Sequence, residues 1–401
     1  MKRTIFLTFL SIGILCIGCK KESQRPKDPN LIFIPKDKIT TIEKIPYNDS
    51  RFIDSCVFIP LETSDAALID EIVQVESYND RYYIYDRHRE TRKLRVFDSK
   101  GKFLFDIGKH GNGAGEYVAM NAFFLNGKEN KVGIFDPMRL AVHEYDLNGK
   151  FLQTIRHGQE SFVSISKTIC ANDCIYCFFD VSSWNDIIYF KLSPKDYSIM
   201  DKWVPYPVKI EGQQMGATLL KHPFSIIGNE LHHISLYSDT LYSYQDGKDR
   251  PYLLIETGKP NIPSDYFKEK PFEHEPNDAF IEIWRDERYS PGFTELFETD
   301  RYIMVKFDFN PDFYILDKDK KETFHILQTE GFYLNFTNSS LVCGNKLVRV
   351  FNQGDIASYQ EVIIKDKKTD YPPQLRELAS NYNAEEDNPV LVVYYMKQST
   401  K

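Results

Sequence analysis

The chain has 401 residues, of which 42% are hydrophobic and 14% aromatic, and this composition excludes a disordered chain for the bulk of the protein. Its 29 Phe and 25 Tyr residues favour strands over helices. The formal net charge of −8 argues against nucleic acid or an anionic membrane surface as a partner, because phosphate binding requires a basic field. The length fits one large β domain or two ordinary domains.

The amino terminus has the pattern of a bacterial secretion signal. Two basic residues precede an apolar run at residues 5–17, which is too short to span a bilayer as a stable anchor. Gly18-Cys19 follows and resembles a lipobox, in which the cysteine receives lipid and becomes the first mature residue. Cys16 departs from that pattern, which prefers Leu three positions before the lipidated cysteine. We expect a signal peptide at residues 1–18 and lipidation of Cys19, with an ordinary cleaved signal as the alternative.

A polar segment with two prolines follows at residues 20–30 and predicts a tether between the lipid and the domain. We assign residues 19–50 to this lipidated N-terminus and tether. Two or three acyl chains hold a protein firmly on a membrane, whereas one chain binds only marginally. The sequence therefore predicts a cell-envelope protein that is lipid-anchored to the outer membrane. Residues 20–23 do not decide whether the protein faces the periplasm or the cell surface.

The central part of the chain contains a repeat, at residues 84–108 and 134–158. Both copies contain an aromatic-Asp pair, a polar loop, an alternating strand, an Asp-x-x-Gly-Lys-Phe-Leu hairpin, another strand and a Gly. The second copy starts 50 residues after the first (134 − 84), and such a period built from short strands is typical of propeller blades.

An aromatic residue followed closely by Asp or Asn recurs along the chain and counts the blades. Because antiparallel strands alternate direction, we expect this mark once per blade, at the outer end of the second strand. The Asp or Asn positions are separated by 50, 44, 59, 69 and 44 residues, and a helical insertion at residues 262–299, between blades four and five, explains the long fourth interval. The six marks are Tyr85-Asp86, Phe135-Asp136, Phe179-Asp180, Tyr237-Ser238-Asp239, Phe307-Asp308 and Phe351-Asn352.

Two turn motifs and one glycine-rich loop are assigned to the scaffold. Residues 98–101 and 146–149 predict hairpin turns, in which Asp bonds local amides and Gly takes a positive φ. Neither motif supplies the further oxygen ligands of a calcium loop. The loop at residues 108–117 lacks the following helix and the Lys-Ser/Thr pair of a phosphate-binding loop. It predicts a tight crossing from one blade to the next.

A propeller ring has an open edge unless strands from both chain ends share a blade. Residues 56–62 and 390–396 are the two candidate closing strands. Apolar residues at helical spacing in residues 372–382 predict a short amphipathic helix that caps the ring before the last strand. The expected fold is all-β, a six-bladed β-propeller of four-stranded antiparallel blades at residues 51–397.

Four short motifs recur in a known family: Leu61-Glu62-Thr63, the Asp98 turn with its Gly-x-Gly-x-Gly-Glu-Tyr crossing, and residues 238–242 and 387–391. In order and spacing they resemble the six-bladed β-propeller lipoproteins of Bacteroidota, relatives of NHL-repeat propellers, over residues 50–397. Ala114 stands where the crossing motif usually has Pro. The resemblance implies the fold and an envelope location, and it implies no general activity.

Strand direction predicts which loops share one face of the ring. The loops after the second strands lie on the same face as the crossings between blades, and we expect a ligand site on this loop face. Arg can bind a carboxylate with two hydrogen bonds, and Trp can stack on a sugar ring. The alternative is ordinary surface residues and turn caps. The candidates are Arg87, His88 and Arg89 from blade one, Arg139 from blade two, Trp184 and Asn185 from blade three, and His110, Glu116 and His157 from the crossings.

No catalytic residue, metal ligand or cofactor is assigned. Cys174 and Cys177, three apart on a strand that follows Cys170, are expected to face opposite ways, which argues against a shared metal ion. The adjacent His232 and His233 are also expected to face opposite ways. The sequence contains neither Gly-x-Ser-x-Gly nor His-Glu-x-x-His. After signal removal five cysteines remain besides the lipidated one, so at least one is unpaired.

Three functions from different classes fit these observations. The preferred one is a monomeric, non-catalytic propeller whose loop face binds a glycan, peptide or protein. One alternative is a metal-dependent lyase or lactonase-like hydrolase with its site on the central axis. The other is a structural subunit of an envelope complex, which predicts an apolar patch on the outer rim.

Overall fold

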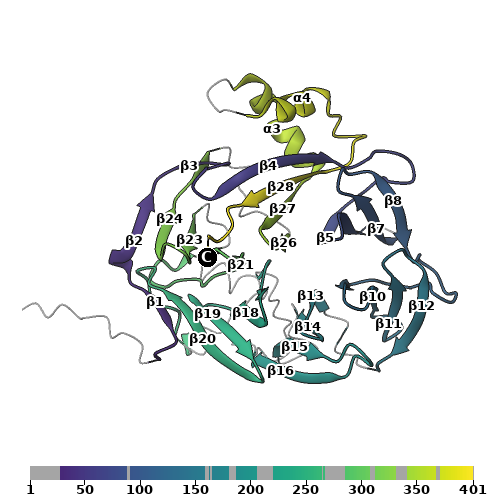
Figure 1. Ribbon diagram of the computed structural model, residues 1–401, viewed down its shortest axis with the longest axis horizontal. Coiled ribbons are helices and arrows are strands. Elements are labelled where there is room, and N and C mark those ends of the chain that lie inside the picture. Colours follow the sequence, from purple (N-terminus) through teal and green to yellow (C-terminus); the bar gives the residue numbers. More distant parts are fainter. Residues whose placement is uncertain are drawn as a thin grey trace, which may run out of the picture.

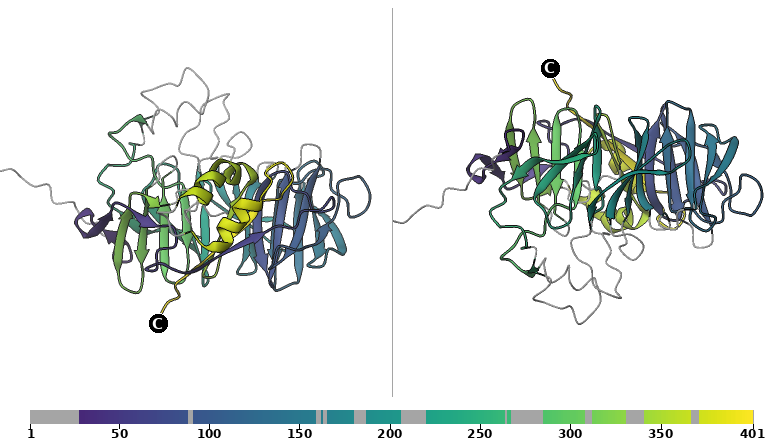
Figure 2. Two further views of the ribbon diagram at one scale, coloured as in Figure 1. Left: turned by 90° about the horizontal axis from the view of Figure 1, so that it is seen from above. Right: turned by 90° about the horizontal axis from the view of Figure 1, so that it is seen from below.

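The computed structural model describes residues 28–87, 91–158, 162, 165–179, 187–205, 220–263, 265–266, 285–307, 312–330, 341–366 and 371–400. Six sheets of four or five strands stand around a central axis (Figure 1). Seen from the side, the ring is a flat disc (Figure 2). The predicted six-bladed propeller is therefore confirmed.

The first three blades follow each other along the chain, each running from the inner to the outer strand. Blade one contains β5 (Ile72–Tyr78), β6 (Arg81–Arg87), β7 (Arg92–Asp98) and β8 (Phe103–Ile107). Blade two contains β9 (Ala122–Asn126), β10 (Lys131–Asp136), β11 (Ala141–Asp146) and β12 (Phe151–Arg156). Blade three contains β13 (Ile165–Ala171), β14 (Cys174–Phe179), β15 (Ile187–Leu192) and β16 (Ile199–Pro205).

The other three blades also use strands from the amino-terminal segment. Blade four contains β17 (Phe224–Ile227), β18 (Glu230–Ile234), β19 (Thr240–Gln245), β20 (Lys248–Ile255) and β1 (Ile32–Ile34). Blade five contains β21 (Glu295–Glu298), β22 (Tyr302–Lys306), β23 (Phe313–Asp317), β24 (Glu322–Ile326) and β2 (Ile39–Ile42). Blade six contains β26 (Leu341–Cys343), β27 (Lys346–Phe351), β28 (Val390–Met396) and β4 (Ile53–Pro60).

The amino-terminal segment runs along the outside of the ring from blade four to blade six (Figure 1). Strands β1 and β2 pair in parallel with β20 and β24, and a 3-10 turn at Lys36–Lys38 separates them. Strand β3 (Ile45–Pro46) then pairs with β25 (Thr329–Glu330). The strands therefore begin at Ile32, before the boundary at residue 51 that the sequence suggested.

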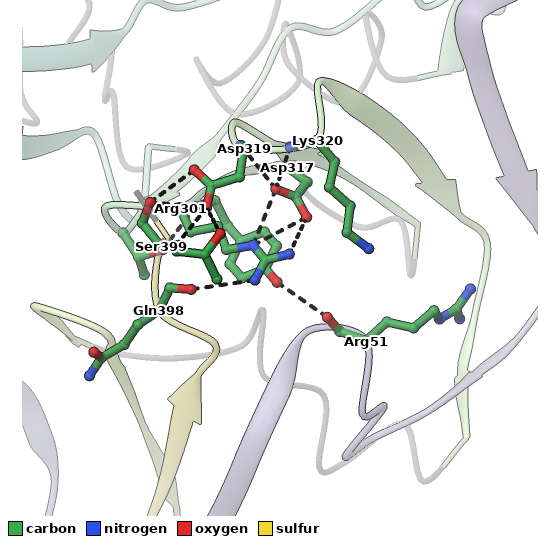
Figure 3. Close-up of polar contacts among 10 residues, drawn as sticks. Arg51, Arg301, Asp317, Asp319, Lys320, Gln398 and Ser399 are labelled. Carbon is green, nitrogen blue, oxygen red and sulfur yellow. Dashed lines mark hydrogen bonds and ion pairs between the residues drawn. The ribbon is translucent and has the colours of Figure 1, made fainter.

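Both predicted closing strands lie in blade six. Strand β28 pairs on one side with β27 and on the other with β4, so the two chain ends complete one sheet. The carboxyl-terminal tail continues to blade five, where Ser399 Oγ and the amide of Thr400 lie 2.9 Å from the Asp319 carboxylate. Arg301 connects Gln398 to Asp317 beside this contact (Figure 3).

Three of the six marks, Tyr85-Asp86, Phe135-Asp136 and Phe351-Asn352, stand at the ends of β6, β10 and β27, the second strands of their blades. Tyr237-Ser238-Asp239 lies between β18 and β19, and Asp180 and Asp308 of the other two marks lie outside the described residues. Asp86 shows the physical reason. Its buried carboxylate accepts from the amides of Asp70 and Glu71, at 3.0 and 3.2 Å, and from Arg95 Nε at 3.0 Å. Asp136 likewise accepts from the Val118 amide at 2.8 Å. In both blades the carboxylate ties the second strand to the segment that leads into the first.

Two helices are inserted between β27 and β28, α3 (Gln353–Lys365) and α4 (Pro373–Asn381). The helix predicted at residues 372–382 corresponds to α4, and α3 was not predicted. Asn352, the sixth mark, caps α3 by accepting from the Asp355 amide at 2.8 Å. Both helices lie outside blade six, beyond β4 (Figure 1), so they cover its rim. Half of the residues of the insertion predicted at 262–299 lie outside the described residues, and β21 of blade five already begins at Glu295.

The core is divided among the junctions between blades. Five clusters of buried apolar side chains, rich in Phe and Tyr, fill these junctions in the described part of the chain. Each large aromatic side chain contributes roughly 1.5–3 kcal/mol by leaving water. The predicted turn at Gly101 has φ +84°, and a Cβ there would lie 2.1 Å from the Pro60 carbonyl oxygen. This turn therefore has to be glycine because it presses against the closing strand.

Candidate functional site

Five of the nine predicted ligand-binding residues are described by the structure. His88, Arg89, Trp184 and Asn185 lie outside the described residues. The others are placed on blades one and two and on the segments that follow them: Arg87, His110, Glu116, Arg139 and His157.

Arg87 makes its two-pronged hydrogen bond within the chain. Its guanidinium donates to both carboxylate oxygens of Glu71, at 2.9 and 2.6 Å. Both side chains are about half exposed, so this pair is solvated at the surface of blade one.

Arg139 and Glu116 come together at the crossing between blades one and two. Arg139 donates to the carbonyl oxygens of Glu116 and Gly111, at 3.1 and 3.2 Å. The Glu116 carboxylate accepts from the Gly113 amide at 2.7 Å and pairs with Lys109 at 2.8 Å. These contacts hold the glycine-rich crossing in shape, as its scaffold assignment predicted.

The two candidate histidines have different surroundings. His110 is exposed, and its backbone bridges to Tyr117. His157 lies against the Phe162 ring, with 4.5 Å between ring centroids, and burial lowers the pKa of His157 to about 4. The neutral imidazole therefore prevails at pH 7.

A polar cavity of about 170 Å³ lies in the central channel. The inner strands of blades one, three, four, five and six line it, and Figure 1 shows the centre of the ring along its axis. Three of its lining residues, Gly228, Asp300 and Gly344, belong to turns between first and second strands. The cavity therefore reaches the face opposite to the predicted loop face. Its polar lining residues are Gln74, Glu76, Lys167, Thr168, His222, Ser225, Glu298 and Asp300.

Blade two contributes its inner strand to the wall behind this cavity. Gln74 Nε2 from blade one and Thr168 Oγ1 from blade three both donate to the Phe123 carbonyl oxygen of β9. Gln74 Nε2 also donates to Glu76 Oε1 at 3.1 Å. The Oε1 atom of Gln74 is buried and has no hydrogen-bond partner among the residues that the structure describes.

The surroundings of Glu76 in the channel perturb its titration strongly. Its side chain is half-buried, but the surrounding blades remove bulk water from it, and this desolvation raises the pKa of Glu76 to about 7. The hydrogen bond from Gln74 and the nearby charge of Lys167 act in the opposite direction and only partly offset it. Near pH 7 this carboxyl group is therefore present in both protonation states.

A second acidic group of the channel wall, Glu298, is held between blades four and five. Its carboxylate lies 2.7 Å from His232 Nδ1 and 3.1 Å from Lys318 Nζ. On its other side, His232 Nε2 lies 3.3 Å from the half-exposed Glu230. His233 instead contacts Trp203 of blade three, so the two adjacent histidines face opposite sides, as predicted.

The cysteines show the same alternation. Cys174 packs in the junction of blades three and four, whereas Cys177 packs in the junction of blades two and three. The five cysteines of the described residues are unpaired: Cys56, Cys170, Cys174, Cys177 and Cys343. Within the described ranges, no three His, Cys, Asp or Glu side chains are grouped to hold a metal ion. No helix in those ranges is both long and apolar enough to cross a membrane.

Comparison with known proteins agrees with the ring architecture. A crystal structure from Bacteroides fragilis, of a protein whose name describes it as exported, has a TM-score of 0.67 and 17% identity, and the match covers 92% of this chain and 100% of that one. A member of the DUF4221 family from Bacteroides vulgatus has a TM-score of 0.51 and 12% identity, and the match covers 86% of this chain and 97% of that one. At these identities the likeness shows the fold alone. No curated protein matches the chain.

The sequence profile of one family, described as Domain of unknown function (DUF4934), matches residues 32–395. This match includes the first strand on the rim and the strand that closes the ring. The chain therefore belongs to the DUF4934 family.

Proposed function

We propose that the protein is an envelope lipoprotein that binds a small polar ligand in the channel of its propeller, without catalysing a reaction. One observation carries this proposal. The inner strands of five blades bring polar side chains to one cavity, where Gln74 Oε1 is buried without a partner among the described residues. Binding sites are typically concave, with a few convergent polar groups and a perturbed titratable residue, and Glu76 is such a residue.

The channel is favoured over the loop face by what the described loop-face residues do. Arg87 is bonded to Glu71, and Arg139 and Glu116 hold the crossing between blades one and two. In the channel, by contrast, the buried acceptor Gln74 Oε1 has no hydrogen-bond partner among the described residues. A glycan, peptide or protein ligand would therefore place a terminal group in the channel, with the loop face as the other possible site.

The envelope location rests on the amino-terminal pattern and on one relative. Residues 1–18 have the composition of a signal peptide, and Cys19 follows a lipobox-like junction. The similar protein of Bacteroides fragilis is described by its name as exported. We place this protein on the outer membrane through a lipid on Cys19, as a monomer related to the NHL-type lipoprotein propellers.

A thermal unfolding screen of the purified mature protein tests the binding function. The panel contains neutral and charged saccharides, short peptides and divalent cations, because a ligand that binds only the folded state raises the melting temperature. At a ligand concentration of 100 times Kd the stabilisation is about 2.7 kcal/mol. A panel without any stabilising ligand contradicts the proposal. So does turnover that appears with a divalent ion and disappears with a chelator, which would favour the metal-enzyme alternative.

Replacement of the lipidated cysteine tests the anchor separately. Cys19→Ala is expected to move the protein from the membrane fraction to the soluble envelope fraction, since the acyl chains are lost. Cys16→Leu, which restores the usual lipobox residue, is the matched control and should remain in the membrane fraction. Membrane retention of Cys19→Ala would overturn the assignment.

A further inference from the structure

The size of the channel cavity limits what can enter it. Its volume is about 170 Å³. A protein cavity of roughly 150 Å³ holds benzene, so this cavity has room for about one six-membered ring, whose substituents would extend into the open part of the channel. Apolar side chains from three blades, Ile169, Phe224 and Leu341, form part of its wall and can pack against the C–H face of such a ring.

The hydrogen bonds of Gln74 indicate that its ligand carries a hydrogen-bond donor for the Oε1 atom. Both of its amide hydrogens are used, one toward Glu76 and one toward the Phe123 carbonyl oxygen. These two acceptors fix the orientation of the amide, and they leave Oε1 as the free acceptor. Gln74 is only 3% exposed, and a buried acceptor without a donor lowers stability measurably. A ligand that donates to Oε1 removes this cost.

The charges around Gln74 disfavour an ionic ligand. Glu76, with its raised pKa, is partly neutral near pH 7, and the charge of Lys167 opposes that of its ionised form. Glu298 is already engaged by His232 and Lys318. Lys167 repels an ammonium group, whereas Glu298 and Asp300 on the same wall repel a carboxylate. A hydroxyl group can both donate and accept a hydrogen bond. It can therefore pair with the donors and the acceptors of the cavity wall without adding a charge.

We propose that the channel cavity binds an uncharged, polyhydroxylated six-membered ring of monosaccharide size, one of whose hydroxyl groups donates to Gln74 Oε1. This inference rests on the proposed binding function and names its ligand class. The ring enters from the face that carries Gly228, Asp300 and Gly344, where the cavity reaches the hairpin turns.

Ring-matched probes test the ligand class on the mature wild-type protein. Neutral glucose, galactose, mannose and myo-inositol are compared with cationic glucosamine and anionic glucuronate by ligand-observed NMR and calorimetry at pH 7. At least one neutral ring is expected to bind about tenfold more tightly than both charged rings. Equal or tighter binding of a charged ring overturns the inference, as does the absence of binding by every neutral ring.

Gln74→Leu tests the acceptor and should weaken binding of the preferred neutral ring about tenfold, the value of one hydrogen bond. Gln153→Leu is the matched control, because that amide lies on the outer strand β12 and bonds Glu144 away from the channel. Its affinity for the ring should equal that of the wild type. Unchanged binding by Gln74→Leu overturns the assignment of Oε1.

Single-deoxy analogues of the preferred ring provide a second test that does not depend on a variant folding. One position is expected to lose about tenfold in affinity for the wild-type protein when its hydroxyl is removed. No loss at any position contradicts the inference. If a peptide or cation stabilises the protein in the wider screen while no neutral ring binds, the ligand class is wrong and the binding function stands. If nothing stabilises it, both are wrong.

Discussion

The raised pKa of Glu76 makes the stability of the propeller depend on pH in a defined direction. The pKa rises from 4.5 to about 7 because burial disfavours the carboxylate. The folded state therefore binds the proton more tightly than the unfolded state does. The stability that this carboxyl group supports is fully present below pH 4.5, and it is lost as the pH rises through 7.

Glu76→Gln removes this titration and keeps the shape of the side chain. The pKa difference, 7 − 4.5, corresponds to about 3 kcal/mol at 1.36 kcal/mol for each unit. The variant is therefore expected to be about as stable as the wild type at pH 4.5 and about 3 kcal/mol more stable at pH 8. Urea unfolding at a series of pH values measures the difference directly.

The exposed Glu385→Gln is the control for this experiment, and it should leave the stability unchanged at each pH. A gain for Glu76→Gln that is the same at all pH values would show that packing, and not desolvation of the charge, is responsible. No gain at pH 8 would refute the reasoning, because it would mean that the ionised carboxylate is adequately solvated in the channel.

Three further predictions concern the scaffold. Asp86→Ala leaves Arg95 buried without its main partner and should cost about 3–5 kcal/mol in urea unfolding, whereas a loss similar to that of the exposed Asp173→Ala would contradict this role. Asp319→Ala removes the carboxylate that accepts hydrogen bonds from the carboxyl-terminal tail, so carboxypeptidase should trim the tail faster, as mass spectrometry can measure. Asp246→Ala, on another hairpin, is the control, and equal trimming rates in the two variants would contradict the role of Asp319. Reductant should leave the melting temperature of the mature protein unchanged, because the described cysteines are unpaired, and a fall would reveal a disulfide.

The blades could be predicted because their signals are local. The Asp of each clear mark is needed where it stands, as Asp86 and Asp136 bond the amides of the neighbouring crossing. The hairpin glycine Gly101 is fixed by a positive φ and by the nearby closing strand. Such requirements leave the same residue types at the same places in the two clear copies, and these copies reveal the blade pattern in the sequence.

The channel site could not be predicted in the same way. Gln74 and Glu76 belong to an ordinary alternating strand, and their facing toward the channel depends on how six blades close into a ring. The polar residues of that strand indicate a channel site only when the closed ring is already known. Strand β1 was missed for a related reason, since three residues that pair with a blade more than 200 positions away leave no periodic pattern of their own.

The chain joins the ring at its circumference. Strand β1 lies against the outermost strand of blade four, and β2 and β3 continue along the same outer edge. A lipid on Cys19 would thus tether the disc by its periphery and not by either of its flat faces. The inner strands that line the channel cavity would then stand away from the point of attachment, so a solute of the envelope could enter the cavity without displacing the tether.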